Sequence, residues 1–145
     1  MANIFLDGKN NLVGGVSFVP AALTTTTNGT PVDLISMVGN QGSAMMVVGA
    51  VSGTQGTLDV KLQECTSTNG TFADITGATF AQVTTSGLTT TALQLCNFKP
   101  TKRYVRAYAT FAGTFTNMLF GVNIFGQGRT TPTNEGGWDN SAAGS

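Results

Sequence analysis

The feature that most constrains the fold is a series of short runs in which apolar and polar residues alternate. The clearest run spans residues 103–112, and others span residues 57–63 and 115–125. A period of two places successive side chains on opposite faces of a β-strand. No segment shows the 3.6-residue period of an amphipathic helix. The sequence therefore predicts an all-β protein with antiparallel strands.

Turn-forming dipeptides separate these runs. Asn28-Gly29, Asn69-Gly70 and Ser86-Gly87 fall between extended segments, and Gly113-Thr114 is expected to form a short hairpin connection. About eight or nine strands at a spacing of roughly ten residues are typical of two packed sheets. We expect an antiparallel two-sheet β-sandwich, either jelly-roll-like or Ig-like.

Several strand boundaries can be predicted from the same signals. Residues 12–19, 31–38 and 88–98 are expected to be extended, and residues 39–42 are expected to form a turn because of their two glycines. Residues 43–51 are almost continuously apolar. This run favours a strand that is buried on both faces or lies under an interface, with a buried helix segment as the alternative.

The chain of 145 residues is expected to form one domain. The sandwich is assigned to residues 1–125, in which residues 1–11 form an N-terminal arm. Residues 126–145 are rich in Gly, Thr, Asn and Ser and lack large apolar residues other than Trp138. This composition indicates a flexible C-terminal arm without a core of its own.

The charge content is low. Charged residues make up 10% of the chain and the formal net charge is zero, whereas an ordinary soluble domain has about 25% charged residues. This balance argues against nucleic acid or a membrane surface as a partner. The start of the chain lacks a secretory signal pattern, so we expect synthesis in a cytoplasm. A weakly charged surface favours a protein whose faces are covered by neighbours in an assembly.

The residue types exclude several chemistries. The chain has no histidine, which removes Ser-His-Asp and Cys-His catalysis and the commonest transition-metal ligand. Two cysteines cannot form a four-thiolate zinc site. The acidic residues are scattered, and no phosphate-binding glycine motif occurs. We expect no catalytic residues, no cofactor, no metal and no small-molecule substrate.

An aromatic and basic stripe is the first candidate contact surface. Tyr104, Arg106 and Tyr108 share one face of the strand over residues 103–112. Such a stripe can stack nucleic-acid bases, but packing within the sheet or a subunit contact is the favoured interpretation because the net charge is zero. Lys61 and Gln63 project from the polar face of a second strand and are assigned to the same candidate interface.

The C-terminal arm supplies the second candidate. Trp138 is isolated in a polar segment that also contains Arg129. A lone aromatic residue on an arm is a good anchor for a pocket on a neighbouring subunit. The alternative is an exposed tryptophan without a role.

Cys65 and Cys96 follow the polar positions of their strands, so both are expected to project away from the face that carries the leucines. Two free thiols are favoured because the expected site of synthesis is reducing. A disulfide formed after release from the cell, within or between subunits, is the alternative.

Four segments together resemble a module of tailed-bacteriophage virion proteins. They are LDVKLQEC (residues 58–65), NGTFADI (69–75), GATF (77–80) and RYVRA (103–107). The group is similar to capsid decoration proteins, which are β-sandwiches on or between major capsid subunits. The resemblance spans residues 57–125 and its motifs are structural.

The resemblance implies a non-enzymatic capsid decoration or cement protein on the virion surface. Its partners would be the major capsid protein and copies of itself, as a dimer or trimer. Two other functions stay open: a tail, baseplate or fibre component of the virion, and a carbohydrate-binding module.

Overall fold

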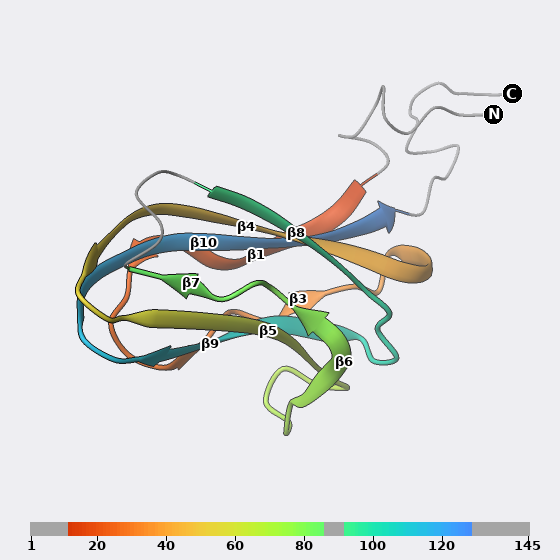
Figure 1. Ribbon diagram of the computed structural model, residues 1–145. Coiled ribbons are helices and arrows are strands. Elements are labelled where there is room, and N and C mark those ends of the chain that lie inside the picture. The colour runs from red at the N-terminus through yellow and green to blue at the C-terminus, as the bar shows by residue number, and fades with distance from the viewer. Residues whose placement is uncertain (1–11, 86–91, 129–145) are drawn as a thin grey trace, which may run out of the picture.

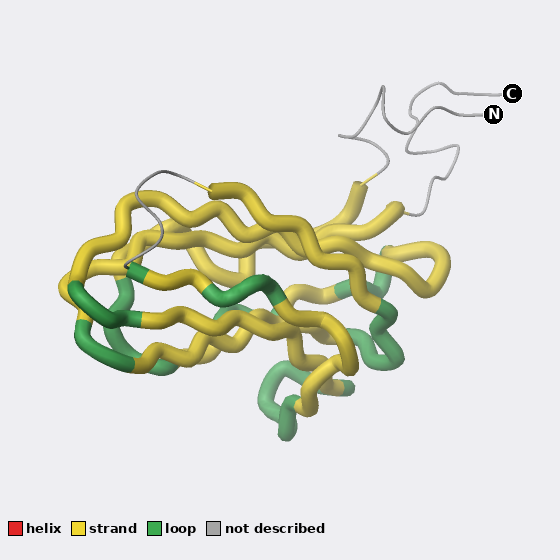
Figure 2. The backbone as a smooth tube through the Cα atoms, viewed as in Figure 1, coloured by secondary structure: helices red, strands yellow, loops and turns green. Residues whose placement is uncertain are grey.

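The structure is a computed structural model that describes residues 12–85 and 92–128. In these residues the chain forms two antiparallel sheets packed face to face, as Figures 1 and 2 show. The predicted all-β two-sheet sandwich is confirmed. Within the described residues no helix is long and apolar enough to cross a membrane.

The two sheets are named sheet A and sheet B. Sheet A, the upper layer in Figure 1, has the order β1 (Leu12–Ala22), β10 (Phe115–Gly128), β4 (Met37–Gly53) and β8 (Ala92–Phe98). Sheet B contains β2 (Thr27–Asn28), β3 (Val32–Asp33), β9 (Tyr104–Ala112), β5 (Thr57–Cys65), β6 (Ala73–Thr79) and β7 (Val83–Thr84). Both β2 and β3 pair with β9, and both β6 and β7 pair with β5.

The strand order identifies a jelly roll. β1 pairs with β10, β2 and β3 pair with β9, β4 pairs with β8, and β5 pairs with β6. These nested pairs form one long antiparallel ribbon. The ribbon is wound so that the β10–β4 and β9–β5 pairs complete the two sheets. The jelly-roll alternative is therefore correct and the Ig-like one is wrong.

The core lies between the two sheets and follows the predicted alternation. The apolar positions of β5, β9 and β10 point inward, together with alternate residues of β4. The largest fully buried side chains are Phe120, Met46, Leu58, Leu62, Met118, Ile124, Val48, Val105 and Val122. Burial of one such side chain stabilises the fold by ~1.5–3 kcal/mol.

Two predicted boundaries on the chain before β4 are wrong. The segment 31–38 is not one strand: Val32–Asp33 form β3, residues 35 and 36 turn, and residues 37 and 38 already belong to β4, which begins at Met37. Residues 39–42 belong to β4 and do not end it. The register between β4 and β10 nevertheless shifts here, from Gly42 opposite Gly126 to Met37 opposite Gly128. The glycines thus permit an irregularity inside one strand, and Gly39 has a φ of +78°.

The expected hairpin at Gly113-Thr114 is also wrong. β9 and β10 belong to different sheets, so this connection is a corner of the sandwich. Gly113 has a φ of +79°, and the backbone of Gln55 passes directly beside its Cα. Only a residue without a Cβ fits this crossing of the chain.

β10 continues to Gly128, three residues beyond the end expected for the sandwich. Val13 and Gly42 flank Gly126 in the sheet, and Leu12 faces Gln127. The central strand β10 therefore continues through residues 126–128, although these residues have no apolar side chain. The predicted N-terminal arm over residues 1–11, the turn at Ser86-Gly87 and the remainder of the predicted C-terminal arm lie outside the described residues.

The corner at Gly113 generates a test. We expect Gly113→Ala to lower the free energy of unfolding by ~3 kcal/mol, because the new Cβ would collide with the Gln55 carbonyl oxygen and positive φ adds strain. Gly77 has a φ of +77° but open space around it, so Gly77→Ala is expected to cost only ~1 kcal/mol. Urea unfolding of both variants measures the difference. Equal losses would show that the close approach to Gln55 does not matter.

Candidate interaction surface

The outward face of sheet A carries uncharged side chains in rows, and most of the large ones are apolar. The register places Val16, Asn123, Met45 and Leu95 side by side across the four strands. The adjoining row contains Gly121, Val47 and Leu93. Directly opposite residues of an antiparallel pair lie on the same face, so these side chains form one surface.

This surface is open to solvent within the described chain. Val19 is 71% exposed, Leu95 67% and Leu93 61%, and Leu12, Val16 and Val47 are exposed as well. Among the described residues, Ile35 is the only exposed large apolar side chain outside sheet A. Contiguous exposed apolar side chains mark interaction sites more often than free surface.

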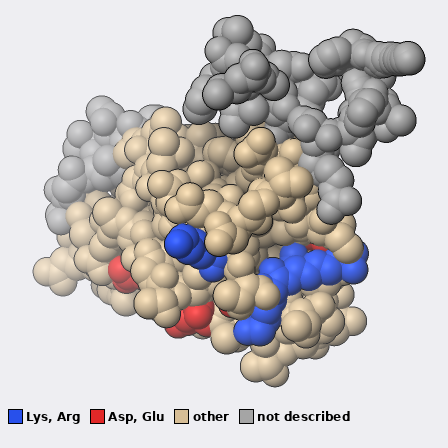
Figure 3. Space-filling model, turned by 90° about the vertical axis from the view of Figure 1, so that its right-hand side faces the viewer, with Lys and Arg blue, Asp and Glu red and all other residues tan. Residues whose placement is uncertain are grey.

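Charge is strictly segregated between the two sheets. The strands β1, β4, β8 and β10 contain no Asp, Glu, Lys or Arg. Every charged residue that the structure describes lies on sheet B or in the loop after β8: Asp33, Asp59, Lys61, Glu64, Asp74, Lys99, Lys102, Arg103 and Arg106. Figure 3 shows these side chains in the middle and lower parts of the molecule, below an uncharged upper layer. One sheet of the sandwich is therefore uncharged and the other carries charged side chains.

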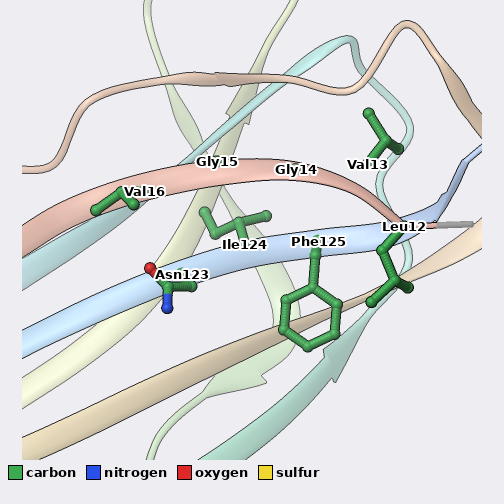
Figure 4. A pocket seen from close by; sticks show the side chains of 8 residues that line it. All are labelled: Leu12, Val13, Gly14, Gly15, Val16, Asn123, Ile124 and Phe125. Atoms are coloured by element: carbon green, nitrogen blue, oxygen red, sulfur yellow. The ribbon is translucent and has the colours of Figure 1, made fainter. Parts of the chain in front are cut away.

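A shallow hollow of about 290 Å³ lies where β1 crosses β10. Its lining residues run from Leu12 to Val16 on β1 and from Asn123 to Phe125 on β10. Leu12 and Phe125 extend from one side of the strand pair and Ile124 from the other, as Figure 4 shows. No ionisable side chain lines the hollow, so it offers apolar contact and no acid, base or nucleophile.

The sequence-predicted stripe is found on the outward face of sheet B. Tyr108 lies opposite Lys61, and Arg106 lies opposite Gln63, so the structure brings all these candidates except Trp138 and Arg129 together. The Arg106 guanidinium donates to Gln63 Oε1 at 3.0 and 3.2 Å and lies 4.0 Å from the centroid of the Phe72 ring. The half-buried arginine therefore holds the segment after the 66–70 turn against the sheet.

The other cations of this face are also engaged within the chain. Lys61 Nζ donates to Asp74 Oδ2 at 2.6 Å, which lowers the pKa of the Asp74 carboxyl. Arg103 makes a two-pronged ion pair with Asp33, at 2.7 and 2.9 Å, and lies over the ring of Tyr104. These contacts support packing within the sheet as the role of the stripe. They leave its cations poorly placed to stack with nucleic-acid bases.

Sequence reasoning missed the role of Glu64. The residue is 7% exposed, and its carboxylate accepts hydrogen bonds from Thr101 N and Thr101 Oγ1, both at 2.6 Å, and from Lys102 N at 3.1 Å. Lys102 Nζ lies 3.7 Å away. The carboxylate thus fastens the loop between β8 and β9. An acidic residue at the apolar positions of β5 was the sequence signal that pointed to a buried partner.

The two cysteines occupy different environments. Both are free thiols. Cys65 points outward as expected but is covered by the 66–70 turn, where hydrogen bonds from Ser67 and Thr66 lower its pKa. As expected, Cys96 projects from the face of β8 that does not carry Leu93 and Leu95, but this face is the inner one. Burial in the core raises the pKa of the Cys96 thiol. The expectation that Cys96 projects outward is therefore wrong, because in β8 the leucines are the exposed set.

The two candidates on the predicted C-terminal arm, Trp138 and Arg129, lie outside the described residues. Within residues 12–85 and 92–128, no group of three or more acidic or cysteine side chains could hold a metal ion.

No protein-family model and no curated protein matches this chain. The resemblance to capsid decoration proteins therefore stays a hypothesis.

The Glu64 clamp predicts a dependence of stability on pH. Burial raises the Glu64 pKa, but the bonds from Thr101 and Lys102 outweigh burial, so the pKa lies below its ordinary value of 4.5. Its stabilisation is complete above the unfolded-state pKa and is lost as the pH falls through the folded-state pKa.

We expect Glu64→Gln to lower the free energy of unfolding by ~2 kcal/mol at pH 7, since it removes charge-assisted bonds to a buried group. The difference from the wild-type protein should shrink on acidification. Urea unfolding at a series of pH values measures both effects, and a pH-independent difference would refute the clamp.

Proposed function

We propose that the protein is a non-enzymatic structural subunit of a phage virion. It binds the outer surface of the capsid through the apolar face of sheet A and stabilises the shell as a decoration protein. The single observation that carries this proposal is the complete absence of charge from the four strands of sheet A, combined with the exposed apolar rows on their outward side. The cores of protein interfaces are depleted of charge in the same way.

The size of the face supports an interface of ordinary extent. β1 alone has 11 residues, and β4 has 17. Four strands about 4.8 Å apart and ~11 residues long cover roughly 700 Å². A standard interface buries about 800 Å² on each partner. One such face can therefore hold a subunit on a lattice without the help of charge.

The assignment to a virion rests on two further supports. The segments LDVKLQEC, NGTFADI, GATF and RYVRA resemble a module of phage decoration proteins. The jelly roll is an architecture that viral capsid domains use, although lectins and other proteins share it, so the fold alone does not assign a function. Arg103 and Lys61 lie over the rings of Tyr104 and Tyr108, which reduces the aromatic surface that a carbohydrate ligand could stack on.

A role without catalysis is supported by the bonds of the described acidic residues. Asp33 pairs with Arg103, Asp74 with Lys61, and Asp59 accepts from Gln82 at 3.0 Å. Glu64 holds the 99–103 loop, as described above. Each carboxylate thus has a structural partner, and the chain has no histidine to act as a general base.

The proposed contact explains how the protein would stabilise a capsid shell. Each copy buries apolar surface on a capsid subunit and releases the water that covers it. Sheet B, with its charged side chains, then faces solvent and keeps the decorated particle soluble. Because the contact repeats around the shell, many modest interfaces add to a large resistance against opening.

The proposal is tested by adding the purified protein to phage capsids that lack it and to isolated phage tails. We expect binding to capsids, not to tails, and a higher temperature of shell opening. Val16→Lys, which places a charge on the apolar face, should weaken binding at least about tenfold. Thr110→Lys places the same charge on the exposed outward face of sheet B and should leave binding unchanged.

Binding and shell opening are measured by co-sedimentation and by dye access to the packaged DNA. Binding to tails alone would replace the capsid proposal with that of a tail component. Equal binding by wild-type protein and Val16→Lys would rule out the apolar face as the contact.

A further inference from the structure

β8 is an open edge of sheet A. In the described chain it pairs with β4 alone, and the register runs from Gly42 opposite Phe98 to Val48 opposite Ala92 without a shift. The strand contains no charge, no proline and no glycine. A regular edge of this kind presents a row of backbone donors and acceptors to any chain that can pair with it.

The opposite edge of sheet A is blocked. Two register shifts interrupt β1, between Val16 and Phe18 and between Phe18 and Ala21, and Pro20 lies in the second one. The segment before β3 also covers this strand, because Thr30 N donates to the Ser17 carbonyl oxygen at 2.7 Å. Bulges, proline and coverage are the devices by which proteins prevent pairing at an edge.

The edges of sheet B are interrupted as well. β2 and β3 are two residues each, and β7 is two residues. β6 bends at Gly77, where φ is +77°, and its register with β5 shifts between Lys61 and Gln63. Among the described sheet edges, β8 is thus the one that is long, regular and uncharged.

The edge at β8 is also held firmly in place. The Gln94 side chain accepts from Ala81 N at 2.8 Å and donates to Ala81 O at 3.2 Å, so it ties β8 to sheet B. Cys96 and Phe98 are buried in the core. Leu93 and Leu95 are left outward and exposed. A strand anchored from behind in this way needs little ordering before it pairs, which lowers the entropic cost of association.

We propose that β8 pairs antiparallel with β8 of a second copy of this chain, so that the two copies share one eight-stranded sheet about a two-fold axis. A symmetric pairing of this kind is self-complementary, since the same residues contribute from both copies. No charge on either strand opposes it. Pairing with faces aligned places Leu93 and Leu95 beside the same leucines of the second copy. The apolar outward face then continues across the dimer.

This inference does not depend on the proposed capsid role, because it concerns the free protein. It is tested by sedimentation velocity of the full chain at rising concentration, in the absence of capsids. We expect a dimer for the wild-type protein. Leu95→Lys and Leu95→Glu should each raise the dissociation constant at least about tenfold, because like charges would face each other across the pair.

Mixing the two charged variants distinguishes pairing from a folding defect. The introduced lysine of one copy would then lie near the introduced glutamate of the other, so we expect a mixed dimer to form. Val19→Lys, at the blocked edge, and Val16→Lys, on the open face, are matched controls that should leave the dimer intact.

Two outcomes would overturn the inference. One is a wild-type monomer at roughly 100 µM, a concentration at which even a weak specific dimer is populated. The other is a dimer that Val16→Lys dissociates and Leu95→Lys does not, which would indicate stacking of two sheet faces. Since capsid binding is measured with Val16→Lys and dimer formation with Leu95→Lys, failure of either proposal is seen separately.

Discussion

The antiparallel pairing of β4 with β10 is the interaction on which the rest of the structure depends. These two strands are the longest in the described chain and lie at the centre of sheet A. Their pairing joins two parts of the wound ribbon that are far apart in sequence, with β1 on one side of the pair and β8 on the other. Met46, Val48, Phe120 and Val122 lie on its inner side at or near zero exposure. Loss of this pairing would open the roll and expose the core at once.

The same pairing explains why the two faces of the molecule differ. Central strands that are apolar inside normally carry polar or charged residues outside. In β4 and β10 the outward positions hold Met45, Val47, Leu119 and Phe125 instead. Among the described residues, the charged side chains lie on sheet B and in the loop after β8, where most of them form ion pairs or cation–aromatic contacts. The two outward faces of the sandwich thus differ in charge, and the large exposed apolar side chains are concentrated on sheet A.

Much of the fold could be predicted from the sequence because alternation is a local signal. The alternating runs that form β5, β9 and β10 are predicted in this way, and their apolar positions point inward. Alternation shows which residues share a face, but not which face is inside. In β8 the alternation predicts that the leucines are buried, whereas the structure places Gln94 on the inner side, where its side chain bonds to Ala81 at the rim of the sandwich. That partner lies in the connection between β6 and β7, outside β8 and its own sheet, so no local pattern reveals it.

The candidate surface was harder to predict for a similar reason. The stripe at Tyr104, Arg106 and Tyr108 stood out because charged and aromatic residues are rare in this chain. In the structure Arg106 of this stripe contacts Gln63 and Phe72. The apolar face is spread over four strands that are distant in sequence, so only the register assembles it. The one local hint was the nearly continuous apolar run at residues 43–51, which was interpreted as a strand buried on both faces or lying under an interface.

The position of Cys96 allows its thiol to report the local opening of β8. The thiol lies on the inner side of β8, is covered by the core, and has a raised pKa. The thiolate of a cysteine is the nucleophile that attacks an alkylating reagent, so the buried Cys96 reacts after β8 separates from the sandwich. The rate at which this cysteine is alkylated therefore measures how often the edge strand β8 separates from the sandwich, and no probe has to be introduced. Any neighbour that pairs with β8 would slow that rate, and the slowing would measure how firmly the neighbour holds the strand closed.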